Sequence, residues 1–246
     1  MSTRSYDYSP AHRALEIVSI LGLAVLVTLL FYEAWLFLRP TPDLALGVLA
    51  GSAFVAYLAA DFASGFIHFM GDTFGDENTP VIGPTFIFPF REHHVLPRKI
   101  TEHDFVETNG NNCVVCVPAA YLVWQFCPAR EALLWAAFSA FVAWFMIWIF
   151  MTNQFHKWSH LEEPPAWIAK LQTWRVILEP GHHDIHHTPP FDTYYCITTG
   201  WLNPLLYKLN FFRISERLIR VIFRIPRPAL AAEPAAPVRE PAEQQG

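Results

Sequence analysis

Long apolar stretches separated by short polar breaks dominate the pattern of this chain. A helix needs about twenty predominantly apolar residues to cross a bilayer. Arg39-Pro40-Thr41-Pro42 interrupts the first apolar stretch sharply, since proline ends helices. The third stretch is short, and reaches about twenty residues only by tilting or by including Asn111-Asn112. We therefore expect four spans, over residues 14–38, 44–66, 113–127 and 133–151.

The segments outside these spans have their own patterns. Turn signals and phenylalanines fill the 70–112 loop, which should lie against the membrane. Pro164-Pro165 predicts the start of an interfacial helix that runs to about Leu178. Residues 194–212 are aromatic and interrupted by proline, as in a re-entrant or interfacial segment. Residues 213–224 alternate basic and apolar positions at helical spacing, which predicts an amphipathic helix on anionic lipid.

The arrangement of basic residues predicts the orientation. With four spans, both termini lie on one side, and only Arg39 and Arg130 fall on the other. By the positive-inside rule, both termini are then cytoplasmic, most simply at a bacterial inner membrane. Residues 1–13 form a polar cytoplasmic N-terminus, residues 14–225 one membrane domain, and residues 226–246 a tail rich in Pro, Ala and Glu that we expect to be disordered.

Composition supports an all-α integral membrane protein. The 246 residues are 53% hydrophobic and 16% charged, whereas soluble domains carry about 25% charged residues. The net charge of −5 gives no indication of a nucleic-acid partner. Cys113 and Cys116 form a CxxC spacing inside an apolar run, which we interpret as small residues of a helix. A zinc or redox pair would need a more polar context.

Histidines carry the candidate chemistry. Ten of the eleven occur between positions 68 and 187, beside the apolar stretches and, in the predicted topology, on the cytoplasmic face. Neutral imidazole is a strong ligand for iron, zinc and copper. We expect a histidine-rich helical cap that holds metal through His68, His93, His94, His103, His156, His160, His182, His183, His186 and His187.

Spacing gives this expectation its detail. His156 and His160 are four residues apart, and the His182–His187 segment contains two more such pairs, so each pair shares a helical face. Adjacent histidines point about 100° apart, so one member of a doublet can face elsewhere. Metal-bound histidines usually donate their second N–H to a carboxylate or carbonyl. The candidate carboxylates are Asp61, Asp72, Glu92, Asp104, Glu107 and Asp184.

The number of histidines points to two ions. A closed structural site takes four ligands, and ten candidates are too many for it. Two ions with about four nitrogen ligands each would leave open positions for O2. Oxidation of an unactivated lipid C–H bond needs such a centre, with the protein excluding water and positioning the chain.

Several segments of the chain resemble the Kua-type lipid desaturase family, with its plasmanylethanolamine and bacterial CarF-type branches. The resemblance covers roughly residues 45–210. The matching segments are Asp61-Phe-Ala-Ser-Gly-Phe-Ile-His68, Phe90-Arg-Glu-His-His94, Ile100-Thr-Glu-His-Asp-Phe105, Glu107-Thr-Asn-Gly-Asn-Asn112, Asn153-Gln-Phe-His-Lys-Trp-Ser-His160, His182-His-Asp-Ile-His-His187, Tyr195-Cys-Ile197 and Gly200-Trp-Leu-Asn203.

The resemblance implies a non-haem enzyme with two iron ions that uses O2 and two external electrons. In the plasmanylethanolamine branch, this chemistry forms the vinyl ether of a plasmalogen from a plasmanyl ether lipid. The family pattern has about eight essential histidines, so it implies that two of the ten here support the others. The unbroken Phe90–His94 and Asn153–Trp158 motifs favour the plasmalogen branch over the plastid one.

Electrons should come from a separate protein. No Gly-x-Gly-x-x-Gly lies in a βαβ context, so we expect no nicotinamide or flavin on this chain. A cytochrome b5-like or ferredoxin-like carrier is the expected donor. An acidic carrier could dock on Arg91, Arg98, Lys99, Lys157 and the basic helix, although solvated charges or lipid headgroups explain these residues equally well.

Aromatic residues are candidates for the alkyl-chain site, and most such residues simply anchor a protein at the membrane interface. The candidates are Phe86, Phe88, Trp158, Trp174 and Trp201.

Two other functions stay open at this point. An acyl-chain desaturase or hydroxylase would use the same centre on a different bond. A metal transporter or sensor would place polar residues near the middle of its spans. The span interiors here are nearly free of charge, which disfavours transport.

Overall fold

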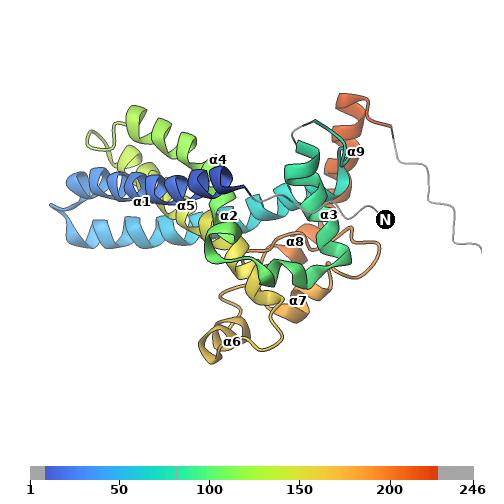
Figure 1. The fold of residues 1–246 in the computed structure, drawn as a ribbon. Helices are drawn as coiled ribbons and strands as arrows, with labels where there is room; N and C mark the ends of the chain where they lie inside the picture. Colours follow the sequence, from blue (N-terminus) through green and yellow to red (C-terminus); the bar gives the residue numbers. More distant parts are fainter. Residues whose placement is uncertain (1–8, 81, 227–246) are drawn as a thin grey trace, which may run out of the picture.

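Helices make up all the regular structure in the described part of the chain. The computed structural model describes residues 9–80 and 82–226. Four long helices form an elongated bundle, and the shorter elements gather at one end of it (Figure 1). The bundle helices are α1 (Pro10–Leu38), α2 (Pro42–Thr73), α4 (Phe105–Phe126) and α5 (Leu133–Ser159). The shorter ones are α3 (Phe88–Val95), α6 (Ala166–Thr173), α7 (Pro180–Asp184), α8 (Asn203–Lys208) and α9 (Phe211–Phe223).

Three of these helices are long and apolar enough to cross a membrane: α1, α2 and α5. Large apolar side chains such as Leu21, Val55 and Leu134 point outward from them, each more than half exposed. A helix that is apolar on its outer face needs lipid as its solvent. This confirms the prediction of an all-α membrane protein.

Helix α4 differs from the other bundle helices in composition. It is 22 residues long and packs against both α1 and α5, but is not one of the three candidate spans. Its first half is polar and bonds to α5: Asn109 Nδ2 donates to Gln154 Oε1 at 3.0 Å, and Asn112 Nδ2 donates to the Ile149 carbonyl at 2.9 Å. A fourth crossing over residues 113–127 therefore stays a prediction.

Small residues bring the bundle helices close together. Ala34, Ala136 and Ala140 are completely buried where α1 meets α5. Ser139 Oγ also donates to the Leu30 carbonyl at 3.0 Å, so a polar contact joins the same helices. Close packing and interhelical hydrogen bonds are the forces available to helices in lipid, where hydrophobic burial contributes little.

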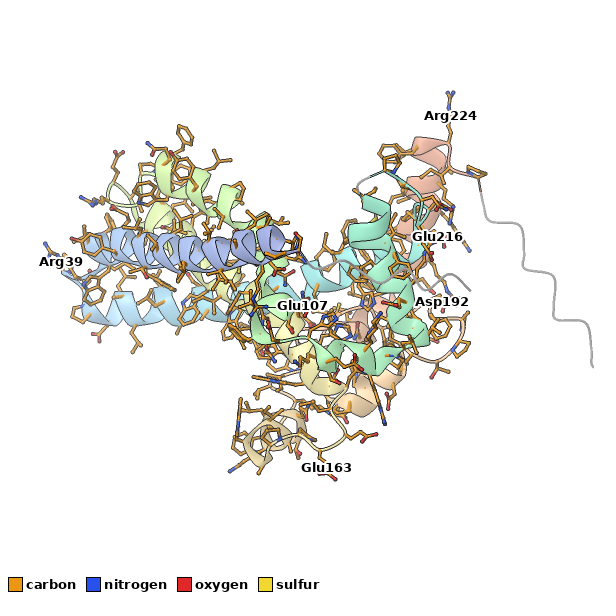
Figure 2. All side chains as sticks on the ribbon, in the orientation of Figure 1. Arg39, Glu107, Glu163, Asp192, Glu216 and Arg224 are labelled. Atoms are coloured by element: carbon orange, nitrogen blue, oxygen red, sulfur yellow. The ribbon has the colours of Figure 1, made fainter. Side chains whose placement is uncertain are left out.

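The two ends of the bundle differ in character. Arg39 lies at the far tip of the bundle, while Asp192, Glu216 and Arg224 lie with the short elements at the opposite end (Figure 2). Near the Arg39 end, an ion pair joins the loop between α4 and α5 to α1: Arg130 Nη2 donates to Glu33 Oε1 at 2.6 Å. The end that carries the short elements is where α2 and α5 finish.

The helix boundaries extend beyond one predicted span and correct one other expectation. Helix α2 continues past residue 66 to Thr73, so its last turns reach the short elements. The helix predicted to run to about Leu178 ends at Thr173, which is a wrong prediction. The Trp201 indole N–H donates to the Arg175 carbonyl at 2.6 Å, and the Tyr57 hydroxyl donates to the Val176 carbonyl. These bonds hold the backbone in a loop, because those carbonyls are taken by distant side chains.

Two other sequence expectations concern the chain ends. The amphipathic helix expected over residues 213–224 is confirmed as α9. Ser9 caps α1 by accepting the His12 amide at 3.2 Å, so the polar N-terminus becomes helical from Pro10. Residues 1–8, and all but the first residue of the tail over 226–246, lie outside the described residues.

Candidate metal centre

Five imidazoles from three segments converge at the end of the bundle. His156 lies on the last turn of α5, His160 follows that helix, His93 comes from α3, and His183 and His187 come from α7 and the turn after it. Their possible ligand atoms all lie within 4.8 Å of one another. We call this the five-imidazole group.

The distances within this group fit a shared metal ion. His183 Nε2 lies 2.9 Å from His156 Nε2, 3.1 Å from His160 Nε2 and 3.1 Å from His187 Nε2. One Nε2 can donate only a single proton, so hydrogen bonding cannot satisfy three such contacts. Nitrogen ligands about 2.1 Å from an ion, at right angles, would be about 3.0 Å apart.

An orphaned atom supports the same interpretation. The Nε2 atom of His93 is buried and has no hydrogen-bond partner in the described part of the chain. Its ring lies 4.5 Å from that of His156 and 4.6 Å from that of His160, between centroids. Buried polar atoms are almost always partnered, so a ligand that the chain does not itself provide would complete this atom.

Electrostatics keep these imidazoles neutral. Burial, followed by the neighbouring His160 and His187, lowers the pKa of His93 well below its usual value. Burial likewise lowers the pKa of His183 well below the usual value, and that of His160 to about 4. Neutral rings have lone pairs available, which is the form that binds metal.

A second group of four residues lies beside the first. It contains His68 and Asp72 from the end of α2, His94 from α3, and His186 from the turn after α7. His186 Nε2 lies 3.2 Å from His68 Nε2, and Asp72 Oδ2 lies 3.1 Å from His94 Nε2. We call this the carboxylate group, because it has one acidic member.

Backbone carbonyls fix how two of these rings are protonated. His68 Nδ1 lies 3.2 Å from the Tyr195 carbonyl, and His186 Nδ1 lies 2.7 Å from the Thr193 carbonyl. A carbonyl oxygen only accepts, so both Nδ1 atoms must donate. The lone pairs are then on the Nε2 atoms, which face the group and Asp72. Metal-binding histidines commonly use their second nitrogen in this way.

The two groups are immediate neighbours. Ring centroids of His94 and His187 are 5.3 Å apart, and those of His68 and His156 are 6.0 Å apart. Two of the three adjacent doublets divide between the groups: His93 and His187 belong to one, His94 and His186 to the other. Adjacent side chains diverge, so one short segment reaches both groups. The arrangement can hold two metal ions side by side, with five imidazoles on one and three imidazoles and a carboxylate on the other.

A buried carboxylate supports the loop that orients these rings. Asp61 is fully buried on α2. Its Oδ1 accepts the amides of Thr199 at 2.7 Å and Gly200 at 2.8 Å, and its Oδ2 accepts the Leu202 amide at 3.1 Å. The sequence analysis considered Asp61 only as a partner for a histidine. A charged residue late in an apolar span was the feature that could have indicated its buried role. The carbonyls of Thr193 and Tyr195 carried no sequence signal.

Two predicted histidines lie outside both groups. His182 Nε2 donates to the Gly200 carbonyl at 2.9 Å, which uses that nitrogen. His103 is partly exposed, and its Nε2 lies 3.8 Å from Glu107 Oε1. The structure thus brings together eight of the ten predicted histidines.

The predicted carboxylate partners take different places. Asp72 lies within the carboxylate group itself. Glu92 pairs with Lys99 at 2.7 Å, and Asp104 caps α4 by accepting the Val106 amide at 2.9 Å. Asp184 is exposed. Of these four carboxylates, only Asp72 contacts the clustered histidines within the described part of the chain.

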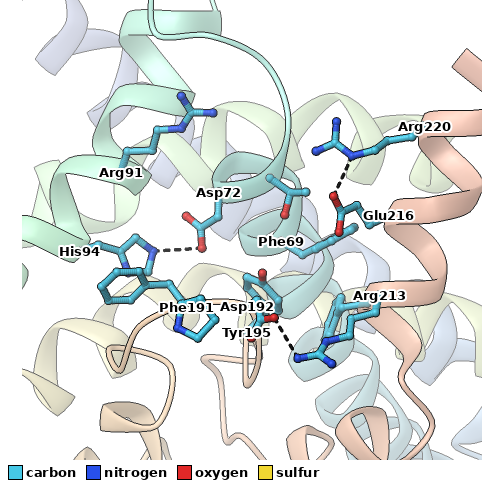
Figure 3. A pocket seen from close by; sticks show the side chains of 13 residues that line it. Phe69, Asp72, Arg91, His94, Phe191, Asp192, Tyr195, Arg213, Glu216 and Arg220 are labelled. Atoms are coloured by element: carbon cyan, nitrogen blue, oxygen red, sulfur yellow. Dashed lines mark hydrogen bonds and ion pairs between the residues drawn. The ribbon is translucent and has the colours of Figure 1, made fainter. Parts of the chain in front are cut away.

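A cavity of about 450 Å³ opens beside the carboxylate group. Asp72 and His94 form its inner wall, and Phe191 and Tyr195 flank it (Figure 3). Helix α9 closes the opposite side with Arg213, Glu216 and Arg220. The cavity therefore joins the candidate metal centre to a charged opening.

The five aromatic residues suggested for an alkyl chain lie elsewhere, and none of them lines this cavity. The Phe86 ring lies tilted against the Phe90 ring, with 4.9 Å between their centroids, and Phe88 is half-buried. Trp158 packs against Trp167 at 5.2 Å between ring centroids, whereas Trp174 is 62% exposed. Trp201 holds the loop described above. A role for them in substrate binding stays a prediction.

Comparison with known proteins adds independent information. A family model described as "Lipid desaturase domain" matches residues 57–228, which include every clustered histidine. No solved structure gives a match.

Three curated relatives illustrate the similarity. "Plasmanylethanolamine desaturase" of Myxococcus xanthus is 47% identical over 212 residues, which cover 86% of this chain and 73% of that protein. "Plasmanylethanolamine desaturase 1" of Mus musculus is 42% identical over 222 residues, covering 87% of this chain and 79% of that protein. "Fatty acid desaturase 4, chloroplastic" of Arabidopsis thaliana is 34% identical over 170 residues, covering 68% and 50%.

Proposed function

This chain belongs to the lipid desaturase family and is a membrane oxidoreductase, and we propose that it is a plasmanylethanolamine desaturase. Its substrate would be a plasmanyl ether lipid and its product the vinyl ether of a plasmalogen. The observation that carries the proposal is the pair of adjacent ligand groups beside a cavity. The two relatives named for this activity support the choice of substrate.

The balanced reaction removes two hydrogens from neighbouring carbons of the ether-linked chain. O2 accepts them together with two external electrons and two protons, and two waters form. We propose that two iron ions occupy the five-imidazole group and the carboxylate group, since nitrogen and carboxylate donors suit non-haem iron. When bound, this iron would supply the O2 chemistry, while the protein supplies positioning and exclusion of water.

The chain's own residues have separate tasks in this proposal. His68 and His186 are held by backbone carbonyls, so their lone pairs stay directed at the centre. Buried Tyr195 lies beside both rings, and Phe69 packs against Tyr195, so these side chains help to keep the two rings in place. The cavity next to Asp72 gives the lipid access to the ligand groups.

Location and electron supply complete the proposal. We place the ligand groups and both termini on the cytoplasmic side, with a bacterial inner membrane as the simplest location. In the predicted topology only Arg39 and Arg130 fall on the other side, and Arg39 lies at the bundle end opposite the short elements. The positive-inside rule assigns the side with more basic residues to the cytoplasm. The electrons would come from a separate cytochrome b5-like or ferredoxin-like carrier.

A direct assay tests the proposed reaction. Membranes containing the protein are incubated with plasmanylethanolamine, O2 and a reducing system, and acid-labile vinyl ether is measured by mass spectrometry. We expect product that depends on O2 and is absent for His183→Ala. Failure to form vinyl ether with a working electron donor would contradict the proposal.

An acyl-chain desaturase is the second candidate, favoured by the relative named "Fatty acid desaturase 4, chloroplastic". It uses the same ligand groups, so the structure of the centre does not separate the two. The relative that supports this second candidate has a lower identity and a smaller coverage than the two plasmanylethanolamine desaturases, so this candidate is the weaker choice. Mass spectrometry of the same incubation discriminates, because a new double bond in an ester-linked chain survives mild acid.

A further inference from the structure

We propose that the cavity beside the carboxylate group binds the headgroup of the lipid substrate. Arg91 and Arg213 would hold the phosphodiester, and Asp192 and Glu216 would face a primary ammonium group at its end. This inference rests on the proposed function, since it specifies how that substrate is recognised. It would make these four residues the determinants of headgroup preference.

The position of the cavity agrees with the position of the reacting bond. In a plasmanyl lipid, only the glycerol carbons and two oxygens separate the first alkyl carbon from the phosphorus atom. A headgroup site must therefore lie directly beside the metal centre. The cavity meets this requirement, because Asp72 and His94 of the carboxylate group line it together with Arg91 and Arg213.

Arg91 and Arg213 have hydrogen-bonding capacity to spare. Arg91 Nη2 donates to the Gly75 carbonyl at 3.0 Å, and no carboxylate of the described residues lies within ion-pair distance of it. Arg213 Nη2 pairs with Asp192 Oδ2 at 3.1 Å. A guanidinium has five N–H donors, so both retain donors for phosphate oxygens, which arginine binds in a bidentate manner.

Arg220 has a different role. Its Nε donates to Glu216 Oε1 at 2.7 Å, its Nη1 donates to the Pro226 carbonyl at 2.8 Å, and its guanidinium lies over the Phe74 ring. It is also buried, so we assign it to holding α9 in place. It would position Glu216 without touching the lipid.

The carboxylates decide which headgroup the cavity favours. Asp192 and Glu216 line the same space as the arginines, and Figure 3 shows them on the side of α9 and the 190–195 loop. A purely anionic headgroup would meet two negative charges there. A zwitterionic headgroup satisfies both signs. A primary ammonium can donate hydrogen bonds to these oxygens, whereas a trimethylammonium cannot.

An acidic electron carrier is a different occupant for the same arginines. Two features argue against it here. The charges line a concave space sized for a small molecule, and the carboxylates within it would repel an acidic surface. Binding of an acidic carrier at these arginines, in place of a lipid, would contradict the headgroup site.

Lipid binding without turnover tests the inference. Full-length metal-loaded protein in detergent is mixed with short-chain phosphatidylethanolamine, and bound lipid is measured by native mass spectrometry. This probe lacks the ether-linked chain, so binding does not require the reaction. The variants are Arg91→Gln, Arg213→Gln and Glu216→Gln. The matched control is Arg217→Gln, an exposed position on α9 outside the cavity. Iron content and thermal unfolding establish that each variant is folded.

We expect Arg91→Gln and Arg213→Gln to weaken lipid binding about tenfold, the typical effect of losing one charge-assisted contact. Arg217→Gln should bind like wild type. Glu216→Gln should reduce the preference for phosphatidylethanolamine over phosphatidylcholine. Inorganic phosphate should compete only weakly, because it lacks the ammonium group.

Three results would overturn the headgroup site. These are wild-type lipid binding by both arginine variants, equal competition by free phosphate and lipid, and a loss confined to electron-carrier affinity. If the lipid binds as expected but no vinyl ether forms, the proposed reaction fails while the headgroup site stands. The two failures are therefore distinguishable.

Discussion

Asp61 allows a quantitative test of how the ligand groups are supported. Its carboxylate accepts three backbone amides, from Thr199, Gly200 and Leu202, and it is completely buried. A hydrogen bond to a charged group contributes about 1.5–3 kcal/mol, and an unpartnered buried amide costs about 1–3 kcal/mol. Asp61→Ala leaves three such amides, so we expect a loss of roughly 3–6 kcal/mol in unfolding free energy, allowing for non-additivity.

Asp61→Asn removes the negative charge but keeps the size of the side chain and part of its hydrogen bonding. The amide oxygen can still accept the Thr199 and Gly200 amides, while its NH2 group would face the Leu202 amide and lose that bond. We expect a smaller loss, of about 1.5–3 kcal/mol. Both variants should also bind less metal, because the loop that they release carries the Tyr195 carbonyl bonded to His68.

The assay is denaturant unfolding in detergent, followed by tryptophan fluorescence. Asp43→Ala is the matched control, since Asp43 is an exposed acidic residue in the first turn of the same helix. That control should cost no more than about 1 kcal/mol. Equal stability of Asp61→Ala and Asp43→Ala would refute the idea that this carboxylate holds the loop.

Three further predictions concern the ligand groups. Asp72→Asn should lower iron from about two per chain to about one, measured by plasma mass spectrometry, because the five-imidazole group stays intact; unchanged iron would exclude Asp72 as a ligand. His93→Ala should lose iron whereas His103→Ala should keep it, and the reverse order would contradict the grouping. Chelated, metal-free protein should lose stability as the pH falls below about 6.5: the unfolded chain gains protons there, while burial holds the pKa of folded His160 at about 4 and that of His187 at about 3. Thermal unfolding between pH 7.5 and 5 tests this, and a flat profile would count against it.

The sequence was informative where a local spacing determines the geometry. The His156/His160 and His183/His187 pairs share helical faces, and both pairs meet in one group. The same rule explains the limit for adjacent residues. Helical spacing indicates that the side chains of adjacent histidines diverge, but it does not indicate which atoms each side chain contacts. His94 and His186 reach the second group, whereas His182 reaches the Gly200 carbonyl instead.

The remaining features depend on contacts between distant segments. His68 and Asp72 have the spacing of ligands on one face, but whether Asp72 lies among the Nε2 atoms or behind a ring depends on where α3 and α7 pack. The cavity forms only when α9 folds back near the end of α2. No local pattern encodes that closure. The early end of α6 has the same origin, since Tyr57 and Trp201 take the carbonyls of the following residues.

Metal content of active protein tests the central claim most directly. Protein purified from membranes with vinyl-ether-forming activity is analysed for metals by plasma mass spectrometry against quantified chain concentration. Two adjacent ligand groups predict about two iron ions per chain, with activity falling as either is removed. Fully active protein with one iron or none would contradict the account.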